Sequence, residues 1–284
     1  MIIGESVATR IQAAGIEPGL ILKFQALLEN LTQLGSAVVA YSGGVDSSFL
    51  SYAAHLALGE RMLAITIHTP QETDETVDFA TSFAQQAGFA HLVIEHDSLL
   101  NPNIRANPAD RCYHCKLVML GLARKYAAEH GYQAVLEGQN ADDEHDYRPG
   151  RKAVVENGAL SPLAQAGFTK AEIRALAKGL GLPIWNRPSS PCLASRVPYG
   201  TPITNQSLRQ IAQGEAFLQA RGFSPVRVRH HTDLARIEVA PEQIERLAAI
   251  HAEVAAYFKG IGFQYVSIDL QGYRQGSLNE ALGL

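Results

Sequence analysis

The residues with the clearest chemical potential form a loop, Ser42–Ser48, between a short apolar segment and a helix-forming segment. Gly43 and Gly44 carry no Cβ, so backbone N–H groups can approach an anion closely. The N-terminus of the following helix adds about half a positive charge, and three serine hydroxyls add donors. The loop therefore predicts a phosphate-binding site. Its residues are Ser42, Gly43, Gly44, Val45, Asp46, Ser47 and Ser48.

No lysine follows this loop, which distinguishes it from the GxxxxGKS and GxxxxGKT patterns, in which a lysine reaches the phosphates. The pattern SGGxDS resembles the PP-loop of ATP pyrophosphatases, enzymes that adenylylate a substrate and release pyrophosphate. The resemblance implies that ATP is used. An ordinary helix-capping turn is the alternative, and Asp46 and Ser47 after an apolar strand favour the binding site.

An acidic segment over residues 137–150 follows the fourth predicted strand. Its carboxylates suit Mg²⁺, which usually binds one or two carboxylates plus substrate phosphates. A solvated acidic loop is the alternative. The superfamily resemblance implies nucleotide contacts from Gly138, Asp142 and, at the end of the second strand, His68. The candidate carboxylates are Glu137, Asp142, Asp143, Glu144 and Asp146.

Three cysteines offer soft ligands or nucleophiles. Cys112 and Cys115 form a C-x-x-C at the start of a predicted helix, and Cys192 lies in a proline-rich loop. The C-x-x-C alone is compatible with a redox dithiol, zinc or an iron–sulfur site. Three cysteine ligands would leave one iron of a cluster open, whereas structural zinc would need a fourth ligand such as His114. Three unrelated buried cysteines are a further alternative.

Two arginines, Arg227 and Arg229, alternate with valines in a predicted strand. The period of two places both guanidinium groups on one face, where they could clamp a phosphate. The alternative is a solvated face on which Asp233 or Glu238 forms weak surface ion pairs with them.

The elements that position these residues alternate between strands and helices in the first half of the chain. This alternation predicts an α/β fold with a doubly wound parallel sheet, which binds ligands at the carboxyl ends of its strands. The expected strands are 36–41, 62–68, 91–96 and 132–136, and the expected helices are 18–34, 47–58, 116–130 and 169–180.

Five prolines within residues 181–204 mark a domain boundary. We expect a PP-loop domain with an N-terminal helix over residues 1–187 and a smaller C-terminal α/β domain that binds substrate over residues 188–284. The second domain should contain helices at 205–221 and 241–258 and strands at 225–231, 234–240 and 264–270.

The composition, with 46% hydrophobic and 18% charged residues, is that of a globular protein. No apolar run of about 18 residues and no secretory signal occur, so we expect a cytoplasmic protein without membrane contact. The net charge of −4 argues against a nucleic-acid surface.

Five separated motifs in order resemble the LarE-type family, ATP-dependent sulfur transferases of nickel-pincer nucleotide biosynthesis. They are SGGVDS, EGQNADDEHDYRPG, CLASRVPYG, VRVRHHTDLARIEV and DLQGYRQGS, and the resemblance covers nearly the whole chain from about residue 34 onward. It implies that the enzyme adenylylates a carboxylate of pyridinium-3,5-biscarboxylic acid mononucleotide and then replaces it with a thiocarboxylate.

The resemblance also implies roles for single residues. Cys112, Cys115 and Cys192 match family members that hold a 4Fe-4S cluster carrying an extra sulfide. In other members a cysteine gives up its own sulfur, and that cysteine lies one residue earlier in the loop, where this chain has Pro191. Cys192 as a sacrificial sulfur donor is the alternative. The resemblance further implies a homo-oligomer and a sulfide-donor or iron–sulfur assembly protein as partner. The substrate's phosphate would be held by Ser195, Arg196, Arg227 and Arg229, with Glu215 and Glu238 near the substrate.

Three rival functions need other features. A PP-loop tRNA thiolase also combines a C-x-x-C with a third cysteine, but it should present a basic, aromatic-rich surface. An ammonia-using amidotransferase would have no use for three cysteines. A non-catalytic nucleotide sensor would need only the loop.

Overall fold

The computed structural model describes residues 14–144, 150–188, 191–274 and 276–278. The chain divides into two compact units. The first unit takes residues 1–69, 74–96 and 112–190, and the second takes residues 70–73, 97–111 and 191–284. The second unit therefore includes two short segments from the first half of the chain.

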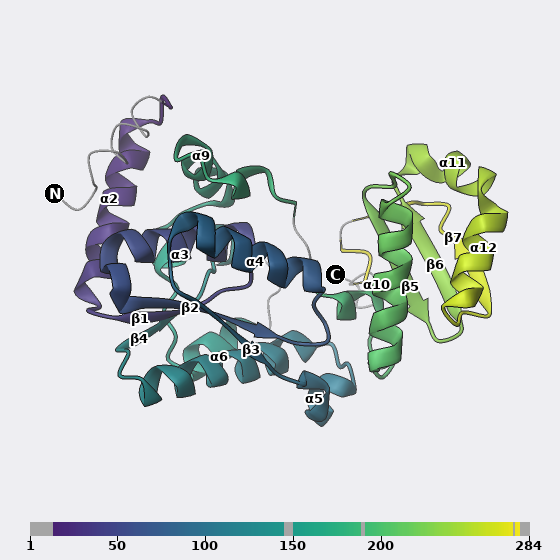
Figure 1. Ribbon diagram of the computed structural model, residues 1–284, viewed down its shortest axis with the longest axis horizontal. Coiled ribbons are helices and arrows are strands. Elements are labelled where there is room, and N and C mark those ends of the chain that lie inside the picture. The colour runs from purple at the N-terminus through teal and green to yellow at the C-terminus, as the bar shows by residue number, and fades with distance from the viewer. Residues whose placement is uncertain (1–13, 145–149, 189–190, 275, 279–284) are drawn as a thin grey trace. The chain divides into compact units, whose positions relative to one another are not determined.

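The first unit is built on a parallel sheet of four strands, in the order β3-β2-β1-β4 (Figure 1). Ala37 of the central strand β1 lies opposite Met62 of β2 and Ala134 of β4. The predicted α/β fold with a parallel sheet is thus confirmed. The strands are β1 (Ala37–Ala40), β2 (Met62–His68), β3 (His91–Glu95) and β4 (Ala134–Leu136).

Both faces of this sheet are buried, which explains its continuous apolar sequences. Ala37 and Val39 belong to one core with helices α2, α3, α4 and α9, whereas Val38 and Ile65 belong to a second core with α6 and α7. Figure 1 shows the strands between α3 and α4 on one side and α6 on the other. These helices are α2 (Pro18–Gln33), α3 (Val45–Leu58), α4 (Asp74–Ala87), α6 (Arg111–Glu129), α7 (Gly150–Glu156) and α9 (Lys170–Gly179).

Short helices complete the connections. In the first unit they are η1 (Gly59–Arg61), η3 (Ala141–Glu144), α8 (Pro162–Gln165) and η4 (Pro183–Asn186). In the second unit they are η2 (Ser98–Leu100), α5 (Pro102–Arg105) and η5 (Leu193–Arg196).

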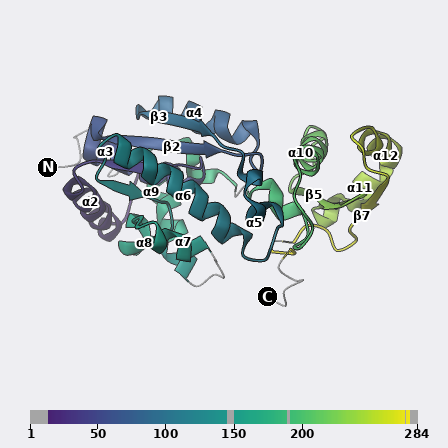
Figure 2. The ribbon, with the colours of Figure 1, turned by 90° about the horizontal axis from the view of Figure 1, so that it is seen from below.

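The second unit has a three-stranded sheet in which β6 lies between an antiparallel β5 and a parallel β7. Val226 and Val228 pack with apolar residues of α10 and α12 in one core, and Figure 2 shows both helices on the same side of the strands. The elements are α10 (Asn205–Gln219), β5 (Val226–His231), β6 (Leu234–Val239), α11 (Ile244–Ala249), α12 (His251–Gly260) and β7 (Tyr265–Ile268).

Two helix predictions need correction. The single helix expected over 241–258 is divided into η6 (Pro241–Gln243), α11 and α12. The boundary between α11 and α12 lies at Ile250, which adopts φ −102° and ψ 22°, outside the helical region. The helix expected from residue 116 begins five residues earlier, at Arg111. Among the described residues, no helix combines the length and apolar character needed to cross a membrane.

Candidate active site

The predicted phosphate loop connects β1 to α3 in the first unit. Gly43 has φ +70°, and a Cβ there would lie 3.2 Å from Ala80 Cβ and 3.3 Å from the carbonyl oxygen of Thr76. Position 43 therefore requires glycine, both for its backbone conformation and for its contact with α4. Gly44 is the N-cap of α3 and provides no side-chain acceptor, so no capping side chain satisfies the first N–H groups of this helix.

Hydrogen bonds made by Ser47 connect the two ends of the phosphate loop. Ser47 Oγ accepts a hydrogen bond from the N–H of Ser42 at 3.2 Å and lies 3.0 Å from Ser42 Oγ. Ser47 Oγ is also 3.3 Å from the carbonyl oxygen of Gly44, to which it can donate. These bonds fix the loop before any ligand binds.

Asp46 is held by a lysine from a distant part of the chain. Lys170, the first residue of α9, donates a hydrogen bond from Nζ to Asp46 Oδ2. Asp46 Oδ1 is buried and accepts no hydrogen bond of standard geometry from a described residue. Burial raises the pKa of Asp46, which Lys170 opposes and the nearby charge of Asp143 reinforces. The loop therefore contains a carboxylate oxygen available to a cation.

The segment after β4 contacts this loop. A Cβ at Gly138 would lie 2.9 Å from Ser47 N and 3.0 Å from Ser47 Cα, so only glycine allows the two backbones to approach. Asp142 Oδ2 accepts a hydrogen bond from the backbone N–H of Lys170 at 2.7 Å. The structure thus brings Gly138 against the loop and Asp142 against Lys170, whose side chain bonds to Asp46, and nucleotide binding by both residues stays a prediction.

The other candidates of the first unit have protein partners. Glu137 is 4% exposed, and its Oε2 accepts a hydrogen bond from Lys116 Nζ at 2.7 Å. His68 lies at the end of β2 with Nδ1 2.9 Å from Glu95 Oε1, and its carbonyl oxygen accepts the N–H of His96. Asp146 lies outside the described residues.

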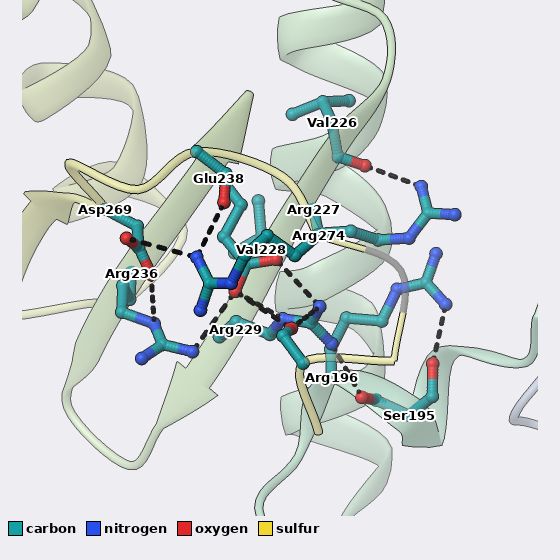
Figure 3. Close-up of polar contacts among 12 residues, drawn as sticks. Ser195, Arg196, Val226, Arg227, Val228, Arg229, Arg236, Glu238, Asp269 and Arg274 are labelled. Atoms are coloured by element: carbon teal, nitrogen blue, oxygen red, sulfur yellow. Dashed lines mark hydrogen bonds and ion pairs between the residues drawn. The ribbon is translucent and has the colours of Figure 1, made fainter. Parts of the chain in front are cut away.

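The residues expected to bind the substrate's phosphate lie in the second unit, where two of the arginines form buried, bidentate ion pairs. Arg229 donates from Nε and Nη2 to Glu238 at 2.9 and 2.7 Å, and Glu238 has no exposed surface. Figure 3 shows Arg229 and Arg236 converging on Glu238. The pairing with Glu238 that the alternative expected is present, but it is buried and not on the surface.

Arg196 and Glu215 form the second pair, with two hydrogen bonds of 2.9 Å. Glu215 Oε1 also accepts the N–H of Val228 at 3.0 Å, which satisfies a backbone donor of the edge strand β5. Arg196 Nη1 donates to the carbonyl oxygens of Pro191 and Cys192 at 2.6 and 3.0 Å. Arg196 thereby holds the backbone of the loop that carries Cys192.

Arg227 has a different environment from these two arginines. Its Nη1 donates to the carbonyl oxygen of Val226 at 2.7 Å, and its guanidinium carbon lies 5.2 Å from the centre of the Tyr273 ring. Burial lowers the pKa of Arg227, and the positive charge of Arg196 lowers it further. No described carboxylate lies within ion-pair distance of this half-buried arginine. It is therefore the arginine here best placed to receive an anionic ligand.

The cysteines are divided between the units. Cys112 and Cys115 lie in the first turns of α6 in the first unit, and Cys192 is the N-cap of η5 in the second. None is in a disulfide; Cys112 is exposed and the other two are half-buried.

Comparisons with known proteins show the family to which the chain belongs. The chain is 38% identical over 264 residues to a pyridinium-3,5-bisthiocarboxylic acid mononucleotide synthase of Lactiplantibacillus plantarum, a match that covers 93% of this chain and 96% of that protein. The chain belongs to the LarE-type family of ATP-dependent sulfur transferases.

A family model and two further relatives also match the chain. A family model described as asparagine synthase matches residues 29–145, which include the phosphate loop. An uncharacterized protein of Synechocystis sp. is 42% identical over 264 residues, covering 91% of this chain and 98% of that protein. A glutamine-hydrolyzing GMP synthase of Aeropyrum pernix is 25% identical over 201 residues, covering 64% of this chain and 39% of that protein.

The residues of this chain suit the two expected groups, Mg²⁺ and an iron–sulfur cluster, to different degrees. The unpaired Asp46 Oδ1 beside Asp143 suits Mg²⁺, which needs only one or two carboxylates when it also binds phosphates. Three cysteines outside any disulfide have the right donor chemistry for an iron–sulfur cluster. Within the part of the chain that the structure describes, no group of three or more His, Cys, Asp or Glu residues is arranged to hold a metal ion.

Sequence reasoning about this LarE-type chain missed Lys170. The loop lacks the lysine of other phosphate-binding loops, and 124 positions separate Asp46 from the lysine that the structure supplies. A signal was present, since Lys170 directly follows Thr169, the N-cap of a helix with a capping box. A positive charge is unfavourable at a helix N-terminus, so a lysine at this position is a candidate for an anionic partner.

Proposed function

We propose that this chain uses ATP to adenylylate a carboxylate of pyridinium-3,5-biscarboxylic acid mononucleotide, releases pyrophosphate, and converts the carboxylate to a thiocarboxylate in nickel-pincer nucleotide biosynthesis. The observation that supports this proposal is the match to the synthase of Lactiplantibacillus plantarum. This match covers 93% of the chain and therefore includes parts of both units. The name of that relative describes the bisthiocarboxylic product of the same mononucleotide.

In the proposed activation step, the loop Ser42–Ser48 binds the phosphates that leave as pyrophosphate. The uncapped N-terminus of α3 provides backbone donors, and Lys170 provides a positive charge next to Asp46. Mg²⁺ would be held through Asp46 Oδ1 and would neutralise charge on the phosphates. Activation is needed because a carboxylate is a poor electrophile, whereas an acyl-adenylate carries AMP as a leaving group.

In the proposed substrate site, Arg227 binds the phosphate of the mononucleotide. Arginines outnumber carboxylates in the surrounding cluster, which favours an anionic ligand. Ser195 completes the site, and the pairs Arg196–Glu215 and Arg229–Glu238 hold its wall in place. The cluster consists of Arg196, Arg227, Arg229, Arg236 and Arg274 with Glu215, Glu238 and Asp269.

For the sulfur-transfer step, we keep Cys112, Cys115 and Cys192 as the proposed ligands of a 4Fe-4S cluster. When bound, such a cluster would supply sulfide, and a sulfide-donor or iron–sulfur assembly protein would replenish it. Loss of sulfur from Cys192 itself is the competing route. The protein's own contribution is to present the cysteine loop, whose backbone carbonyls at Pro191 and Cys192 are held by Arg196.

The test is a reaction with protein purified without oxygen and reconstituted with iron and sulfide, to which ATP, Mg²⁺ and the mononucleotide are added. We expect pyrophosphate release that requires the mononucleotide, together with a thiocarboxylate product detected by mass spectrometry. Pyrophosphate release that requires a transfer RNA instead would identify a tRNA thiolase. A protein that stays colourless after reconstitution, and whose Cys192 becomes lighter by H₂S during turnover, would establish the sacrificial route.

A further inference from the structure

The loop that carries Cys192 is fixed by one buried asparagine of the second unit. Asn107 has no exposed surface, and its Nδ2 lies 3.2, 2.8 and 3.1 Å from the carbonyl oxygens of Val197, Pro198 and Thr201. Its own carbonyl oxygen accepts the N–H of Gly200 at 2.9 Å. Asn107 has φ +56°, a conformation that asparagine tolerates better than most residues but that still needs support. One residue thus holds four backbone groups of the loop.

Arg111 extends this contact to the residues next to Cys192. The Arg111 side chain is buried, and its Nη1 donates to Asn107 Oδ1 at 2.5 Å and to the carbonyl oxygen of Ala194 at 3.0 Å. Ala194 lies two residues after Cys192, and Arg111 directly precedes Cys112. The same guanidinium group therefore connects the Cys192 loop to the peptide that enters the C-x-x-C.

A third attachment comes from residues 70–73. The N–H of Leu193 donates to the carbonyl oxygen of Gln71 at 2.8 Å, and Gln71 is itself buried and accepts a hydrogen bond from Ser98 Oγ at 2.5 Å. The two short segments that belong to the second unit, 70–73 and 97–111, thus both bind the cysteine loop. None of these groups belongs to the phosphate loop or to the arginine cluster.

We propose that Asn107 and Arg111 are positioning residues for sulfur transfer, because they hold the Cys192 loop in a fixed conformation and tie it to the chain immediately before Cys112. This inference rests on the proposed function, in which both segments supply the cysteines. Their role lies in the transfer half of the reaction and not in the activation half.

The proposal has a specific chemical consequence. An acyl-adenylate that meets no sulfur nucleophile reacts with water: a C–O bond to water forms, the C–O bond to AMP breaks, and the original carboxylate and AMP are released with protons. A misplaced cysteine loop would therefore leave pyrophosphate release intact and lower the amount of thiocarboxylate formed per pyrophosphate. Loss of orientation by about 1 Å can slow a reaction by about 100-fold, so a decrease of about tenfold or more in this ratio is expected.

The test compares Arg111→Gln and Arg111→Lys with the control Arg105→Gln, which changes an exposed arginine of the same segment. Three quantities are measured: pyrophosphate release, thiocarboxylate per pyrophosphate, and amide hydrogen exchange of residues 192–203 in the cofactor-free protein. We expect R111Q to lower the product ratio and to speed exchange in this loop, R111K to recover part of both, and the control to resemble the wild type. An unchanged ratio, or pyrophosphate release that falls in parallel with product, would overturn the proposal.

A second measurement keeps the inference testable if Arg111→Gln does not fold. In the wild-type, cofactor-free protein, the amides of Leu193 and Gly200 should exchange slowly, because both donate to buried partners. Exchange of the Gly200 amide at the rate of an unstructured chain would show that the loop is not fixed by Asn107, and the proposal would fail. If the wild type makes pyrophosphate but no thiocarboxylate, the proposed function fails instead, while the exchange result still decides whether the loop is held.

Discussion

Lys170 donates a hydrogen bond to Asp46 inside the phosphate loop, although the two residues are 124 positions apart in the chain. The contact joins the first residue of α9 to the first turn of α3. It places a positive charge beside a loop whose sequence contains none, and Asp46 Oδ1 accepts no hydrogen bond of standard geometry from the described residues, although the nearby Asn140 side chain also lowers the pKa of Asp46. The arrangement of charge around Asp46 leads to the first prediction.

Affinity for Mg²⁺–ATP should fall as the pH falls through the pKa of Asp46, because only the ionised carboxylate binds the cation. Burial raises this pKa, so the loss should occur at a higher pH than for an exposed aspartate. Lys170→Met should move the midpoint to higher pH, since the lysine lowers the pKa, and Asp143→Asn should move it to lower pH. Calorimetric titration with Mg²⁺–ATP over a pH series measures the midpoint for each variant. Midpoints that shift in the same direction in the two variants would contradict the assignment of this transition to Asp46.

Gly138→Ala should weaken ATP binding and destabilise the first unit by about 1–3 kcal/mol, the usual range for overpacking. The new Cβ would lie 2.9 Å from Ser47 N, and both contacting groups are backbone, so the phosphate loop itself would have to move. Gly19→Ala is the matched control, because a Cβ at that position would meet open space beyond its own helix. Equal ATP affinity in both variants would show that Gly138 does not set the loop's position.

Glu238→Gln should destabilise the second unit by about 3–5 kcal/mol, because Arg229 would lose its buried counter-charge. Urea denaturation measures the change. The double variant Glu238→Gln with Arg229→Met should cost less than the sum of the single changes, since each change removes the same pair. Glu253→Gln is the control: its pair with Arg221 is exposed, so the cost should be below about 1 kcal/mol. If the losses in the free energy of unfolding of the two single variants simply add in the double variant, Arg229 and Glu238 do not stabilise each other.

Arg227→Gln should raise the Kd for the mononucleotide by about tenfold or more, with little change in the melting temperature. A charge-assisted contact to phosphate contributes about 1.5–3 kcal/mol, and no described carboxylate loses a partner when Arg227 is replaced. Arg229→Gln should instead lower the melting temperature, because it leaves Glu238 buried with fewer donors. A variant of Arg227 that binds the mononucleotide normally would remove this arginine from the proposed site.

Much of the fold follows from local sequence. Strand β2 begins and ends where its apolar run predicts, and a capping box of Thr169 and Glu172 starts α9 within the helix expected over 169–180. These features depend on residues close together in the chain, so periodicity and capping chemistry suffice to find them. The division of the helix after Pro241 was not predictable in the same way, because Ile250 has no breaking tendency of its own.

The partners of charged side chains depend on tertiary contacts, which periodicity does not encode. Arg229 was expected beside Arg227 in a phosphate clamp, but it forms a buried pair with Glu238 across the strands. Lys170 and Arg111 were not singled out, because each meets its partner only when distant segments fold together. Sequence pattern predicted residue types that suit the proposed chemistry, whereas the partners of these residues are visible only in the structure.

The most direct test of the central claim follows an oxygen atom. If the carboxylates of the mononucleotide are labelled with ¹⁸O and the reaction is run with ATP, acyl-adenylate formation joins one labelled oxygen to the α-phosphate. Displacement of AMP by sulfur then leaves that oxygen on AMP. We predict ¹⁸O in the phosphate of AMP, none in pyrophosphate, and a thiocarboxylate that has lost one label. Unlabelled AMP, or label in pyrophosphate, would contradict activation of the carboxylate as an adenylate.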